Sequence, residues 1–177
     1  QQDPLQFRLD LLAAHPKHLA VLKLAADQAN WGQQAPGVYQ GIAVHESFGS
    51  VVAEVVTLKA QDSGLKISDV TCAVDCGIAV NPDLVKAQIE SGVIFGLTAA
   101  LKGKITLQDG AVEQSNFHDY GMLRMHESPN VQVHIVANQN RPSGVGEPGT
   151  PPIAPALANA IFAATGKRQR ALPLSLS

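Results

Sequence analysis

The sequence is poor in charge and has no concentrated block of either sign. Only 16% of its 177 residues are charged, 13 basic and 15 acidic, for a net charge of −2. Binding along a nucleic-acid backbone needs clustered positive charge, so no nucleic-acid partner is expected. The one basic stretch, Lys167 to Arg170, is short and is interpreted as a solvated segment. The low charge also suggests a surface that is partly covered by something else.

Long apolar runs and cysteines are scarce as well. No uninterrupted apolar run approaches the ~20 residues that a membrane-spanning helix needs, so no membrane span is expected. Cys72 and Cys76 are the only cysteines, too few for a zinc site. Their even spacing puts both on one face of a regular strand, where disulfide geometry is poor and core packing is favoured. Apolar residues still make up 45% of the chain, which allows a sizeable core.

The pattern of apolar and turn residues predicts an α+β fold with segregated helices and strands. Two helices are expected to begin at a cap followed by proline, at Asp3-Pro4 and at Asn81-Pro82, and to run to about residues 14 and 101. Further helices are predicted over 18–29 and 154–165, the last ending at Gly166. Strands are predicted over 38–44, 50–59, 66–74 and 131–136, with a small hairpin over 104–114.

We interpret the chain as a single fragment, 1–177, of a larger domain. It divides into a helical lead-in over 1–31, a linker over 32–37 rich in Gly and Pro, and an α+β body over 38–177. The compartment stays open between cytoplasm and periplasm.

One carboxylate, Glu147, lies in a loop of glycines and prolines over 144–152, just before the last predicted helix. Glycine permits unusual backbone angles and close approach, and proline stiffens the loop, so together they fix where the carboxylate points. A nearby helix N-terminus favours its ionised form, which can take a proton. The alternative is an exposed turn with an incidental glutamate. The loop lacks the Lys and Ser/Thr that end a phosphate-binding Walker loop.

The helix after Asn81 has a face of small residues and one amide. Its members are Gln88, Gly92, Phe95, Gly96 and Ala99, and Glu90 and Ser91 lie beside it. Such a face allows either a flat ligand or another backbone to come close, and the amide offers a donor and an acceptor to a ring edge. The alternative is tight packing, with Gln88 bonded to backbone.

A third polar stretch, His45-Glu46-Ser47, lies between two predicted strands. Adjacent residues of an extended chain point to opposite faces, so His45 and Glu46 are not expected to meet in a triad. We expect a structural role for His45 or contact with a pocket edge, and no metal ligated by protein side chains.

These stretches, with three others, occur in an order and spacing that resemble the C-terminal region of a known family. The segments are Asp3–Leu12 (DPLQFRLDLL), Gly41–Ser50 (GIAVHESFGS), Ala73–Pro82 (AVDCGIAVNP), Ala87–Gly92 (AQIESG), Gln114–Met125 and Gly144–Pro148 (GVGEP). The family is that of the molybdopterin-binding large subunits of isoquinoline 1-oxidoreductase-type molybdenum hydroxylases, which belong with xanthine dehydrogenase and aldehyde oxidase.

The resemblance implies a function for several residues. Glu147 is implied as general base in hydroxylation of an N-heteroaromatic carbon or oxidation of an aldehyde, with water as the oxygen source. Gln88 and Gly146 are implied to contact the cofactor, a molybdenum-pterin expected in its cytosine dinucleotide form, with Glu90 and Ser91 beside them. The pterin, rather than protein side chains, is implied to hold the metal. Electrons are implied to leave through [2Fe-2S] clusters on a partner subunit.

The sequence lacks other segments of that family. The Glu-Met-Gly-Gln-Gly loop, the Ser/Gly-rich segments and the Gly-Gly-Gly-Phe-Gly stretch are absent. A partner is therefore expected: the remainder of the large subunit, or a companion chain carrying those loops. Two alternatives remain, a non-catalytic scaffold and a module that binds a small ligand or phosphate at 144–149.

Overall fold

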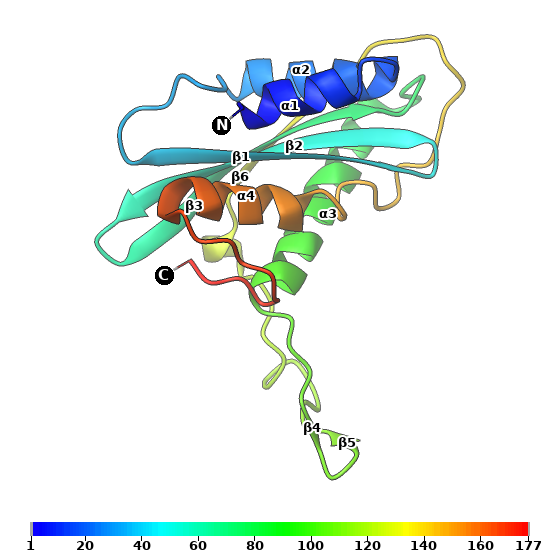
Figure 1. Ribbon diagram of the computed structural model, residues 1–177. Helices are drawn as coiled ribbons and strands as arrows, with labels where there is room; N and C mark the ends of the chain where they lie inside the picture. The colour runs from blue at the N-terminus through cyan, green and yellow to red at the C-terminus, as the bar shows by residue number, and fades with distance from the viewer. Residues whose placement is uncertain (1, 177) are drawn as a thin grey trace.

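A four-stranded sheet forms the centre of the computed structural model, which describes residues 2–176 (Figure 1). Its strands lie in the order β1 (Val38–Ser47), β2 (Ser50–Gln61), β3 (Gly64–Asp75) and β6 (Asn130–Ile135). The first three form consecutive antiparallel hairpins, whereas β6 runs parallel to β3. The predicted α+β class is confirmed, as are all four strands, the first three being longer than predicted.

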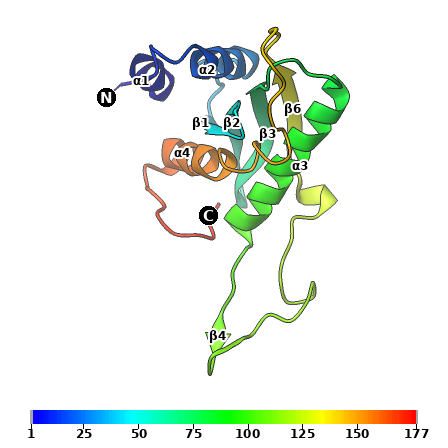
Figure 2. The same cartoon turned by 90° about the vertical axis from the view of Figure 1, so that its right-hand side faces the viewer.

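Helices cover both faces of this sheet (Figure 2). The helices α1 (Pro4–Leu11) and α2 (Pro16–Gln28) lie over one face, and α3 (Pro82–Leu101) and α4 (Ile153–Thr165) lie over the other. The side chains of β2 alternate between the two faces of the sheet, so this strand contributes to a hydrophobic cluster on each. Val51 and Val55 belong to the cluster under α2, and Val52 and Val56 belong to the cluster under α3 and α4. Residues 137–152, which contain Glu147, connect β6 to α4, and we call them the base loop.

The predicted helix starts are mostly confirmed by their caps. The Asp3 side chain accepts a hydrogen bond from the Gln6 amide, and the Asn81 side chain accepts one from the Leu84 amide. The predicted start of the second helix at His18 is wrong. That helix begins at Pro16, because the fixed φ of proline suits the first turn of a helix.

Helix α3 is a core helix of unusual length and apolarity. By length and composition alone its 20 residues could cross a membrane. Lys86 and Glu90 interrupt its apolar run without preventing a long helix. In this fold Ile89, Val93 and Leu97 are fully buried among the residues of the main core.

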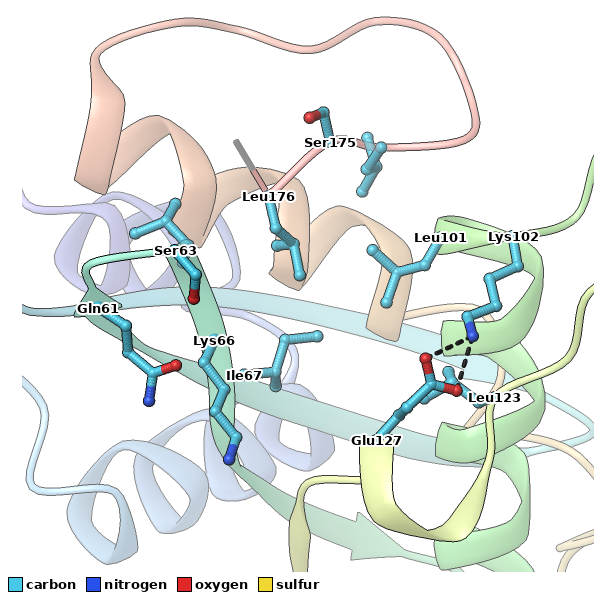
Figure 3. Close-up of a pocket in the computed structure, with 12 residues that line it drawn as sticks. Gln61, Ser63, Lys66, Ile67, Leu101, Lys102, Leu123, Glu127, Ser175 and Leu176 are labelled. Carbon is cyan, nitrogen blue, oxygen red and sulfur yellow. Dashed lines mark hydrogen bonds and ion pairs between the residues drawn. The ribbon is translucent and has the colours of Figure 1, made fainter.

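An arm, residues 102–124, leaves the end of α3 and extends away from the body (Figure 1). Its tip is the predicted hairpin, formed by β4 (Leu107–Gln108) and β5 (Ala111–Val112). After the arm a short 3-10 helix, η1 (Met125–Glu127), leads to β6. Where the arm leaves α3, Lys102 Nζ lies 2.6 Å from each carboxylate oxygen of Glu127. This ion pair lies beside a groove of about 590 Å³ (Figure 3).

Candidate functional site

The base loop is fixed on one side to the ends of three strands. The amide of Ser143 donates to the carbonyl of Cys76, just after β3, and the amide of Gly144 donates to Phe48 in the turn between β1 and β2. A Cβ at Gly144 would lie 2.8 Å from the Cβ of Phe48, so glycine is needed there for close approach.

The other side of the loop packs on the small-residue face of α3. A Cβ at Gly92 would lie 3.3 Å from the backbone of Gly149, and Thr150 donates its hydroxyl to the Gly92 carbonyl at 3.3 Å. A Cβ at Gly96 would clash with Ile153, the first residue of α4. Of the two interpretations of this face, close packing of another backbone is therefore the one observed, and the backbone is that of the loop itself.

Gln88 and Gly146, separated by 58 residues, meet at the outer end of this contact. The Gln88 Nε2 donates to the Gly146 carbonyl at 3.0 Å. Gly146 and Glu147 are exposed, whereas Pro148 and Gly149 are buried. The Thr150 amide donates to the Glu147 carbonyl at 3.0 Å and closes the turn. The chain thus presents the Glu147 carboxylate outward from a turn held on both sides.

Space is open at Gly146, the residue before Glu147. A Cβ built on Gly146 meets no atom within 4 Å, in contrast to Gly144 and Gly149, where a Cβ would press on neighbouring atoms. Two glycines of the loop therefore serve packing, and the third faces room in which a ligand can approach the backbone.

Glu90 and Ser91 line a different surface. Together with Phe95, Met122 and Leu123 they border a groove of about 410 Å³ between α3 and the return of the arm. The structure thus brings Gln88, Gly146 and Glu147 together and places Glu90 and Ser91 in a neighbouring groove.

The His45 stretch forms no triad. His45 is exposed, and Glu46 instead lies 3.4 Å from the Nε2 of His18 on α2. Within residues 2–176 no three His, Cys, Asp or Glu side chains gather in a way that could hold a metal.

A buried acid was missed at the sequence level. Glu54 on β2 is fully buried, and the Cys72 thiol donates to one of its oxygens at 3.8 Å. Burial raises the pKa of Glu54 well above its usual 4.5, which favours the protonated carboxyl. The available signal was an acid within the otherwise apolar run 51–56. The packing interpretation of Cys72 and Cys76 is confirmed, since both are buried free thiols.

Comparison with known proteins decides the family. Residues 15–129, more than half of the chain, match a family model described as a molybdopterin cofactor-binding domain. The chain belongs to this family. Within this molybdopterin cofactor-binding domain, Gln88, Glu90 and Ser91 lie in the matched region, while Gly146 and Glu147 lie beyond it.

Similarity to individual proteins agrees with this family assignment. The chain is 36% identical to isoquinoline 1-oxidoreductase subunit beta of Brevundimonas diminuta, over 97% of this chain and 23% of that protein. It is 28% identical to a membrane-bound aldehyde dehydrogenase of Gluconacetobacter polyoxogenes, whose name includes pyrroloquinoline quinone, over 98% of this chain and 25% of that one. The chain thus spans about a quarter of the length of these relatives.

A solved structure shares the fold. The CO dehydrogenase of Oligotropha carboxidovorans superposes with a TM-score of 0.58 at 20% identity, over 66% of this chain and 16% of that one.

Proposed function

We propose that the chain contributes the general base, Glu147, and one wall of the cofactor site to a molybdenum hydroxylase. The reaction would hydroxylate an N-heteroaromatic carbon or oxidise an aldehyde, with water as the oxygen source. The observation that supports this most strongly is the Gln88–Gly146 hydrogen bond, because it anchors the turn from which the exposed Glu147 projects.

The residues at this position fit a flat, polar cofactor. Gln88 lies at the surface and uses one amide proton on Gly146, which leaves its other proton and its oxygen for a pterin edge. Gly146 leaves its backbone open to close approach. Glu90 and Ser91, in the next groove, would extend the contact. The pterin, rather than protein side chains, would hold the metal.

When bound, the molybdenum-pterin group supplies the two-electron redox centre. The role of Glu147 is to take the proton of the attacking oxygen, for which its carboxylate must lie within hydrogen-bond reach of that oxygen. The buried Pro148 and Gly149 and the closed turn limit how far the backbone of Glu147 can move. A fixed backbone lowers the entropic cost of placing the base at each turnover.

We propose that the remainder of a large subunit, or a companion chain, completes this site. Exposed apolar side chains support the proposal, among them Phe95 beside the Glu90 groove and Leu107 and Phe117 on the arm. The chain covers only 23% of the length of the isoquinoline 1-oxidoreductase subunit, which supports this proposal as well. A [2Fe-2S] subunit would take the electrons, and the pterin would carry a cytosine nucleotide.

Glu147→Gln in the assembled enzyme tests the base. The amide keeps the shape but cannot take the proton, so turnover should fall by about 10²–10⁴-fold while molybdenum and pterin content stay unchanged. The matched control is Glu113→Gln, an exposed acid on the arm, which should leave turnover unchanged. Turnover near that of the unchanged enzyme in Glu147→Gln would rule out the assignment.

The second candidate is a scaffold that lacks catalysis, favoured by the packing of the small-residue face of α3 against the loop. Metal and cofactor analysis of the denatured assembly separates the two. Molybdenum with a pterin nucleotide supports the hydroxylase, whereas their absence supports the scaffold. Pyrroloquinoline quinone in their place would contradict both.

A further inference from the structure

A separate cavity lies at the end of α4 away from the base loop, where α1 and α4 flank the edge strand β1 (Figure 2). Its volume is about 570 Å³, within the range of sites for small molecules. Residues of α1, the turn after α2, β1, the C-terminal half of α4 and the segment after it line the cavity. None of the predicted cofactor residues belongs to it.

The walls of this cavity are aromatic. Phe7, Trp31 and Phe162 all line it, contributed by three different segments. The Trp31 ring is fixed by its Nε1, which donates to the Asp3 carboxylate at 3.1 Å. Aromatic side chains that line one cavity favour a flat ring beside them.

Two guanidinium groups complete the lining. Arg168 stacks on the Phe162 ring, with Cζ 3.9 Å from the ring centroid. Arg8 is half-buried, and its Nη1 donates to the Pro4 carbonyl at 2.8 Å. Within residues 2–176 no carboxylate lies within ion-pair distance of either group. Burial lowers the pKa of Arg8, and the nearby charge of Asp3 opposes this effect in part.

We propose that this cavity binds a small planar aromatic anion, an aryl carboxylate or an aryl phosphate. The ring would stack on the aromatic walls, and the anionic group would accept hydrogen bonds from Arg8 and Arg168, whose planar donors match both anions. Lys167 and Arg170 flank Arg168 in the chain and add positive potential. The basic stretch 167–170, interpreted from sequence as merely solvated, thereby gains a binding role. This site is independent of the function proposed for Glu147.

The chain carries its own reporter for the test. Trp31 is the only tryptophan in the sequence and lines the cavity, so its fluorescence reports on this site alone. Titration of the full chain with benzoate or phenyl phosphate should change that fluorescence saturably. Benzyl alcohol, which has the ring without the charge, and inorganic phosphate, which has the charge without the ring, should each bind at least about tenfold more weakly. Whichever of benzoate and phenyl phosphate binds more tightly identifies the anionic group that the site takes.

Variants locate the binding. Arg8→Gln should weaken the better probe by at least about tenfold, as expected for a lost charge-assisted hydrogen bond. Arg124→Gln, an exposed arginine outside the cavity, and Glu147→Gln should both leave binding unchanged. Circular dichroism shows whether each variant is folded. If Arg8→Gln does not fold, Arg168→Gln takes its place in the test. The proposal is overturned if neither anion gives a saturable change, if benzyl alcohol binds as tightly, or if folded arginine variants bind as the unchanged chain does.

Discussion

Helix α3 and the arm follow one another in the chain, yet they use apolar residues in opposite ways. Ile89, Val93 and Leu97 of α3 are completely buried, while Leu107 and Phe117 of the arm are 69% and 71% exposed. Burial from water is what makes an apolar side chain stabilise a fold. The difference indicates that α3 holds the domain together, whereas the apolar residues of the arm are available to a partner.

The largest effect should come from truncating a leucine in each region. Leu97→Ala should lower the free energy of unfolding by about 2–5 kcal/mol, because it removes buried methyl groups and leaves a cavity in the main core. Leu107→Ala should change it by less than about 0.5 kcal/mol. Chemical denaturation of the chain measures both. A similar loss in the two variants would contradict the division between core helix and arm.

A smaller effect should come from adding one methyl group to a glycine. In Gly96→Ala the new Cβ would press on Ile153 and lie 2.9 Å from the Thr150 carbonyl, so we expect a loss of about 1–3 kcal/mol. The control is Gly121→Ala on the arm, where the nearest atom to a new Cβ is 3.7 Å away. Equal melting temperatures for these two variants would mean that the base loop does not pack tightly on α3.

The buried core and the arm should also respond to pH with opposite sign. Because the pKa of Glu54 is raised in the fold, its contribution to stability is complete below pH 4.5 and declines as pH rises toward the raised value. The free energy of unfolding should fall by up to about 1.4 kcal/mol per pH unit over that window. Glu54→Gln should remove this slope in denaturation series at pH 5–8, and an unchanged slope would show that Glu54 is not its source.

On the arm, Asp119 provides the matching contrast. The backbone amides of Asn116 and Ser115 lower its pKa to about 2. Its stabilising contribution is therefore present above its usual pKa of 3.8 and is lost as pH falls through about 2. Amide resonances of Ser115 and Asn116 should report this local change in an NMR titration.

The smallest effect concerns the bond that positions the base. Gln88→Met keeps side-chain length but removes the hydrogen bond to Gly146, and should cost only about 0.5–1 kcal/mol because the bond is exposed. The amide resonance of Glu147, which shares the Gly146 peptide group, should shift. Gln108→Met at the arm tip should leave that resonance in place, and no shift in Gln88→Met would mean that the bond does not hold the turn.

Local signals predicted much of the fold. Asp3-Pro4, Asn81-Pro82 and Gly166 marked helix ends, the last through a left-handed φ of 70°. The start of α2 at Pro16 was not predicted, because proline is found both after the end of a helix and in the first turn of one.

Long-range features could not be predicted in the same way. The parallel pairing of β3 with β6 joins segments separated by α3 and the arm, and nothing in either strand specifies its partner. For the site, sequence singled out Gln88, Gly146 and Glu147, but their juxtaposition depends on Gly92 and Gly96 admitting the loop. The burial of Glu54 likewise follows from helices covering both faces of β2, which the alternation along one strand does not reveal.

The separation between Gln88 and Gly146 has a consequence for how the site comes into being. During synthesis α3 leaves the ribosome well before the base loop, and the arm and β6 must follow before the amide of Gln88 finds its carbonyl. Contacts between distant residues form late, because closing long loops costs entropy. The surface that presents Glu147 is therefore among the last parts of this domain to mature, and until then α3 has its glycine face open to whatever binds there.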